Sequence, residues 1–61
     1  MTAHAHILVV EDEVNIRSAL VTMLEKLGHR VSGAGTAEEA LALLEDSPAD
    51  LVITDLRMPG L

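Results

Sequence analysis

The sequence predicts an α/β protein in which three parallel strands alternate with two helices, the βαβαβ half of a doubly wound parallel sheet. Four consecutive aliphatic residues, Ile7 to Val10, are typical of a strand that is covered on both faces. Two amphipathic segments with helical spacing separate the three strand-like runs. Because helical connections of this length place successive strands parallel, we expect right-handed crossovers on one sheet.

The first two elements are predicted as a strand from His6 to Glu11 and a helix from Val14 to Leu27. The helix repeats its apolar residues at i, i+3 and i+4, which indicates a single core-facing stripe. Val21 is the one apolar residue outside that stripe. The predicted stripe consists of Ile16, Ala19, Leu20, Met23, Leu24 and Leu27.

The ends of this helix and the strand after it have weaker signals. Glu13 and Arg17 stand four positions apart, a favourable spacing for an ion pair. Gly28 suits the left-handed conformation that ends many helices. The next strand, Arg30 to Gly35, contains a single β-branched aliphatic, Val31, and is predicted mainly from its place between two helices.

The second helix begins near Thr36, which forms a capping-box pattern with Glu39. Leu43 lies off the apolar stripe, and Pro48 ends the helical region. The last strand is predicted from Leu51 to Thr54. The stripe consists of Ala37, Ala40, Leu41 and Leu44.

Composition excludes several classes of function. The chain has 61 residues, a net charge of −6, no cysteine and no aromatic residue. Direct contact with nucleic acid by this segment is therefore not expected, since it lacks a basic patch and stacking side chains. No apolar run approaches the roughly 20 residues of a membrane span, so a cytoplasmic location is expected. A chain of about 60 residues buries a marginal core, so we expect residues 1–61 to be a truncated domain.

Carboxylates follow two of the predicted strands. Glu11 and Asp12 follow the first strand, and Asp55 follows the third. If the first strand is central, these side chains emerge together at the carboxyl edge of the sheet, where such folds bind ligands. Clustered carboxylates repel one another unless a hard cation such as Mg²⁺ binds between them. Asp55 could then act as a nucleophile toward a phosphoryl group.

The runs "ILVVEDE" and "LVITDLRMPG", with the amphipathic helices between them, resemble the N-terminal half of a response-regulator receiver domain, the phospho-acceptor module of two-component signalling. The resemblance extends from Ala5 to Leu61. It implies a flavodoxin-like fold with strand order 2-1-3, the order that the carboxylate argument requires.

The resemblance also implies roles for individual residues. Asp55 would accept a phosphoryl group from a histidine kinase or a phosphotransfer protein. Asp12 and Asp55 would bind Mg²⁺ directly, Glu11 would act through a water, and the backbone carbonyl of Arg57 would complete the protein ligands. Such a domain is a signalling switch rather than an enzyme, and it would control an output domain in the same chain, here a transcriptional one. The family's hydroxyl and lysine switch residues lie beyond this sequence, so we expect residues 1–61 in isolation to be inactive as a switch.

Two other functions remain open at this stage. One is a phosphatase related to haloacid dehalogenases with Asp55 as nucleophile, although those enzymes carry D-x-D after their first strand. The other is an interaction module that is never phosphorylated. In either case the outer edge of the third strand would be exposed, which predicts self-association through that edge.

Overall fold

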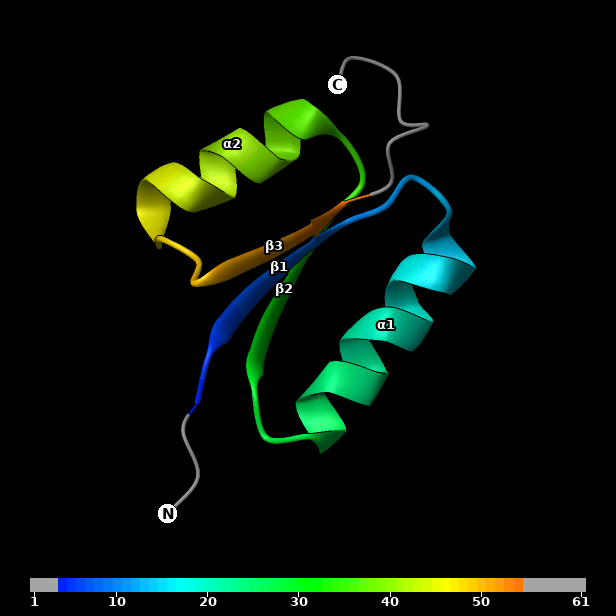
Figure 1. Cartoon of the computed structure of the whole chain (residues 1–61). Coiled ribbons are helices and arrows are strands. Elements are labelled where there is room, and N and C mark those ends of the chain that lie inside the picture. The colour runs from blue at the N-terminus through cyan, green and yellow to red at the C-terminus, as the bar shows by residue number, and fades with distance from the viewer. Residues whose placement is uncertain (1–3, 55–61) are drawn as a thin grey trace.

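The computed structural model describes residues 4–54 and contains the five predicted elements in the predicted order (Figure 1). The strands β1 (His6–Val10), β2 (Arg30–Ala34) and β3 (Leu51–Thr54) are all parallel and lie in the order β2-β1-β3. The helices α1 (Val14–Lys26) and α2 (Ala37–Asp46) lie on opposite faces of this sheet. The predicted fold class and strand order are therefore confirmed.

The central strand β1 forms the core of the molecule. Its four aliphatic residues, Ile7 to Val10, are all buried, and Val9 is fully buried. Leu8 and Val10 pack with Ala34 and Ala40 on the α2 face of the sheet. A strand buried on both faces explains why this segment is uniformly apolar instead of alternating with polar residues.

The strand predicted from Arg30 to Gly35 forms as β2 and ends one residue earlier, at Ala34. Each of its five residues pairs with a residue of β1, from His6 with Arg30 to Val10 with Ala34. The extent of β2 is thus set by its pairing with the apolar strand β1. This pairing compensates for the low intrinsic strand propensity of the β2 sequence.

The helix termini have the capping residues that the sequence indicates. Thr36 caps α2, and its side chain accepts a hydrogen bond from the Glu39 N–H at 3.1 Å. The reciprocal bond of the capping box is displaced by one residue, because the Glu39 carboxylate accepts from the Gly35 N–H at 2.8 Å. Gly28 has φ of 97°, the left-handed conformation predicted after α1.

The predicted core face of α1 is partly wrong. Ile16, Met23 and Leu27 are exposed at 44%, 53% and 62%, and Ala19 is exposed as well. Val21, placed off the stripe, is instead half-buried against Gly33 of β2. The apolar arc of α1 is wider than the part that contacts the sheet. The helix packs mainly over β2, so the Val21 side of the arc is covered and the opposite flank is left open.

The predicted stripe of α2 needs a similar correction at one position. Ala40 is buried and Leu44 packs against the core, but Leu41 is 63% exposed. The small side chain of Ala40 lets α2 approach the sheet closely, and Leu41 lies at the flank of this contact.

Strand β3 pairs with β1 along one edge, and the structure describes no strand on its other edge within residues 4–54. Leu51 and Val52 are about half exposed. Over the same residues, neither helix is long and apolar enough to cross a membrane.

Candidate functional site

The three consecutive acidic residues Glu11, Asp12 and Glu13, here called the acidic loop, connect the carboxyl end of the central strand to α1. The N–H of Glu11 donates to the carbonyl of Ala34 at 2.9 Å, which continues the β1–β2 ladder by one residue. This bond places Glu11 at the edge of the sheet between two strand ends. Its side chain is buried, with 5% of its surface exposed.

The two flanking carboxylates of the loop accept backbone hydrogen bonds. The Glu13 N–H donates to Glu11 Oε2 at 3.1 Å. Glu13 is the N-cap of α1, and its Oε1 accepts from the Asn15 N–H at 3.0 Å. This contact fits the dipole role expected of a carboxylate at a helix start. Asp12 lies between these two anchored residues and is exposed to solvent.

The register of the sheet brings the end of β3 beside the acidic loop. Thr54 is the partner of Val10, so the residues that follow these two positions in the chain are Asp55 and Glu11. Asp55 and Arg57 themselves lie outside the described residues, and their predicted roles stay predictions. Within residues 4–54, no group of three or more His, Asp or Glu side chains is arranged to hold a metal ion.

Arg17 is the site residue that the sequence reasoning misassigned. The spacing predicted a pair with the Glu13 carboxylate, but the Arg17 guanidinium donates from Nη1 to the backbone carbonyl of Glu11 at 2.9 Å. The Glu13 carboxylate is instead used as the helix cap. A sequence shows which side chains are charged but not which backbone carbonyl groups are free to accept a hydrogen bond. The prediction was therefore right that Arg17 binds an oxygen of the acidic loop, but it named the wrong oxygen.

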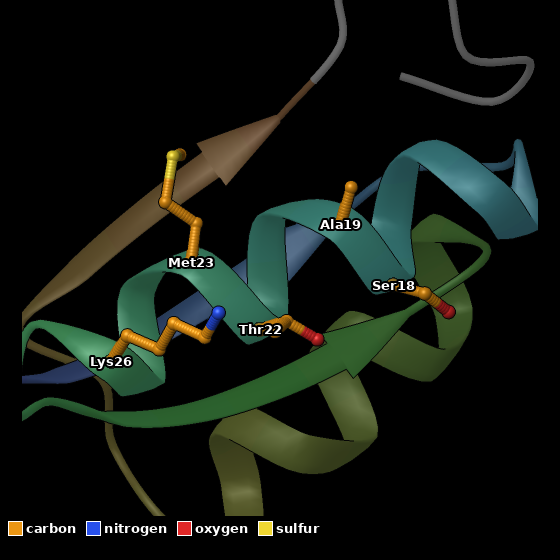
Figure 2. A pocket seen from close by; sticks show the side chains of 5 residues that line it. All are labelled: Ser18, Ala19, Thr22, Met23 and Lys26. Atoms are coloured by element: carbon orange, nitrogen blue, oxygen red, sulfur yellow. The ribbon is translucent and has the colours of Figure 1, made fainter.

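The hollows of the surface lie away from the acidic loop. The larger, of about 490 Å³, lies on the outer side of α1 (Figure 2) and is lined by Ser18, Ala19, Thr22, Met23 and Lys26. A smaller one, of about 230 Å³, lies at the opposite, amino edge of the sheet and is lined by His4, Ala5, His6, Arg30 and Asp50. Of these two hollows in the described part of the chain, neither is lined by Glu11 or Asp12.

At the amino edge, histidines serve as structural connectors. The ring of His6 contacts the Pro48 carbonyl at 2.8 Å through Nδ1 and the Ser32 hydroxyl at 2.9 Å through Nε2. His29 is half-buried, and its Nδ1 accepts a hydrogen bond from the Ala5 N–H at 3.2 Å. These bonds give the two rings a role in joining the strand ends.

Comparison with known proteins identifies close relatives of the sequence. Residues 7–61 match the family described as "Response regulator receiver domain". The probable transcriptional regulator ycf27 of Cyanidium caldarium is 48% identical over 92% of the chain. The C4-dicarboxylate transport transcriptional regulatory protein DctD of Rhizobium meliloti is 39% identical over the whole chain.

Solved structures show the same arrangement of elements. The N-terminal domain of a response regulator receiver protein from Methanoculleus marisnigri is 42% identical, with a TM-score of 0.87 over 93% of the chain. The non-phosphorylated HemR receiver domain from Leptospira biflexa is 40% identical, with a TM-score of 0.80. The chain spans 46% of the first solved structure, 22% of the Cyanidium protein and 13% of the Rhizobium protein.

Proposed function

Because the chain belongs to the response regulator receiver domain family, we propose that it is a phosphorylatable signalling switch in which Asp55 accepts a phosphoryl group. The donor is a histidine kinase or a phosphotransfer protein that carries a phosphohistidine. The relatives named as transcriptional regulators support an output domain that acts on transcription. This membership removes the support for a dehalogenase-type phosphatase.

The pairing of Val10 with Thr54 is the observation that carries this proposal. It sets the acidic loop and the residue before Asp55 at neighbouring positions of one sheet edge. An exposed Asp12 beside a buried Glu11 offers oxygen donors of the kind that Mg²⁺ prefers, so the residues present fit that ion. The proposed ligands are Asp12, Asp55 and the backbone carbonyl of Arg57, with Glu11 acting through a water.

In the proposed reaction, a carboxylate oxygen of Asp55 attacks the phosphorus atom, and the bond from phosphorus to the donor imidazole nitrogen breaks. The products are an aspartyl phosphate and the donor histidine, whose leaving nitrogen takes the bonding electron pair and one proton from water, so the step needs no oxidant and no further group. Bound Mg²⁺ would supply positive charge against the phosphoryl oxygens. The aspartyl phosphate carries about 1.5 to 2 negative charges if the value for phosphoserine applies, in place of the single charge of the carboxylate, and this more negative group biases a two-state element.

The test is incubation of a full-length protein that contains residues 1–61 with Mg²⁺ and either acetyl phosphate or beryllofluoride, followed by intact-mass analysis or NMR. We expect one equivalent of a Mg²⁺-dependent adduct, lost in Asp55→Asn and kept in the matched control Asp46→Asn, which changes an exposed aspartate at the end of α2. Repeated turnover of acetyl phosphate would indicate a phosphatase. The absence of any adduct would refute the switch and favour an interaction module.

The free edge of β3 within the described residues supports self-association as a second property of the chain. Unpaired backbone groups and the half-exposed side chains of Leu51 and Val52 form a template for another strand. Sedimentation at micromolar concentration measures this directly. A single monomeric species with cooperative unfolding contradicts it.

A further inference from the structure

Arg17 is bonded to both ends of the acidic loop. Its backbone N–H donates to the Glu13 carbonyl at 2.9 Å, which is the ordinary i to i−4 bond of a helix. Its guanidinium Nη1 donates to the Glu11 carbonyl at 2.9 Å, which lies six positions back, outside the helix. One residue of α1 therefore holds the beginning of the loop through its side chain and the end through its backbone.

Two glycines of the neighbouring segment leave room for this side chain. A Cβ atom on Gly33 would lie 3.4 Å from Arg17 Cδ, and a Cβ atom on Gly35 would lie only 2.7 Å from Nη1. Among the described residues only Gly28 has positive φ, so the backbone of Gly35 does not itself require glycine. The space is required by the guanidinium, since a side chain at position 35 would displace it or be displaced.

The bond to the Glu11 carbonyl has a consequence for Asp12. The Glu11 carbonyl and the Asp12 N–H belong to one planar peptide group, so fixing the oxygen also fixes the direction in which the Asp12 backbone continues. Glu11 is already held at its N–H by Ala34 and at its carboxylate by the Glu13 N–H. The hydrogen bond from Arg17 restricts rotation of the peptide group between Glu11 and Asp12.

We propose that Arg17 is a positioning residue for the acidic loop: by holding the Glu11 carbonyl over Gly35, it sets the direction in which Asp12 presents its carboxylate. This inference deepens the proposed function, on which it rests for the part that concerns Mg²⁺. It assigns Arg17 no contact with the metal or the phosphoryl group.

The test compares Arg17→Ala, Arg17→Lys and Gly35→Ala in the intact protein, by NMR titration with Mg²⁺ alone and by amide hydrogen exchange without metal. Loss of such a supporting contact typically weakens metal affinity roughly 10-fold, and we expect this in Arg17→Ala and Gly35→Ala. The Glu13 N–H should exchange faster in both. Arg17→Lys, which keeps the charge but offers a differently shaped donor, should lie between these variants and the wild type.

The direction in which Mg²⁺ affinity changes distinguishes a positioning role of Arg17 from an effect of its charge. Removal of a positive charge near a cation site would by itself tighten Mg²⁺ binding, so weaker binding in Arg17→Ala cannot be a Coulomb effect. Gly35→Ala keeps the charge and displaces the guanidinium, but its Cβ would also lie 3.2 Å from Glu39 Oε1. The Arg17 variants leave Glu39 unchanged, so agreement between Gly35→Ala and Arg17→Ala assigns the effect to the guanidinium. The matched control is Arg30→Ala, which loses the same charge at the other end of β2, where its Nη2 donates to Ser47 Oγ, and which should bind Mg²⁺ within 2-fold of wild type.

Wild-type Mg²⁺ affinity together with unchanged Glu13 exchange in Arg17→Ala would overturn the inference. If Arg17→Ala fails to fold, Gly35→Ala and Arg17→Lys give the same comparison. If the wild-type protein itself does not bind Mg²⁺, the proposed function fails. The exchange rates of the metal-free variants then still decide whether Arg17 holds the loop.

Discussion

Thr36→Ala and Thr22→Ala delete the same atoms from two helices of this chain, and we expect them to change its stability in opposite directions. Thr36 is the N-cap of α2, and its hydroxyl accepts the Glu39 N–H at 3.1 Å. Thr22 is an exposed residue inside α1. The first substitution removes a cap, whereas the second replaces a β-branched residue by the best helix former.

The magnitudes follow from these two positions. Loss of a threonine N-cap costs about 1 kcal/mol of unfolding free energy. Replacement of threonine by alanine in a helix interior contributes about 0.5 kcal/mol in the opposite direction. The resulting difference of about 1.5 kcal/mol corresponds to roughly 1 M in the urea midpoint, for a slope between 1 and 2 kcal/mol per M.

Urea unfolding followed by circular dichroism measures both midpoints, and hydrogen exchange of the Glu39 amide reports on the cap locally. Thr36→Ser keeps the hydroxyl and should restore most of the stability. The reasoning is refuted if Thr36→Ala unfolds at the wild-type midpoint, or if Thr36→Ser is as destabilised as Thr36→Ala. Equal shifts for Thr36→Ala and Thr22→Ala would also refute it.

Three further substitutions are expected to lower stability for separate reasons. Leu8→Ala should cost about 3 kcal/mol in a urea titration, because Leu8 is 1% exposed in the central strand, and a loss below about 1 kcal/mol would contradict this core. Gly28→Ala should cost about 1–2 kcal/mol. The cost comes from backbone strain at φ of 97° and not from a steric clash, because the added Cβ would meet no atom within 4 Å. A thermal unfolding curve that coincides with that of the wild type would contradict it. His6→Ala should cost about 1 kcal/mol, because the hydrogen bonds of the ring to Pro48 and Ser32 are lost. The β2 amides should then be less protected from hydrogen exchange. Unchanged protection would show that the ring does not join β1 to β2.

The strand order 2-1-3 was implied by the resemblance to receiver domains and was the order that clustered carboxylates required. The structure agrees with it, and the burial of Ile7 to Val10 on both faces fits a strand in the centre of the sheet. Strand β2 was predictable from its spacing and not from its composition. Gly33 within the strand and Gly35 just after it lower the strand propensity of this segment, and the structure shows that both leave room for the side chain of Arg17.

The core face of α1 was less predictable, because hydrophobic periodicity gives the apolar arc of a helix but not which part of the arc contacts the sheet. The lack of a side chain at Gly33 draws Val21 toward β2, and the flank with Ile16 and Met23 turns outward. The contact is set by the partner strand, which a helix sequence considered alone does not contain.

The site was predictable where it depends on strand ends. Glu11 and Asp12 lie at the carboxyl edge of the central strand, and Thr54 pairs with Val10 as the argument required. The bond from Arg17 to a backbone carbonyl was not predictable, because its acceptor has no side-chain signature. The roles of Asp55 and Arg57 remain predictions.

Arg17 Nη1 lies only 2.7 Å from the position that a Cβ atom on Gly35 would occupy. This proximity also constrains which substitutions the sequence can accept at the two positions. A side chain at position 35 would require the guanidinium to shift as long as arginine occupies position 17, and would require no such shift once the side chain at position 17 is shorter. The effect of a change at either position therefore depends on the residue at the other. We expect the two positions to be inherited as a pair, although they lie far apart along the chain.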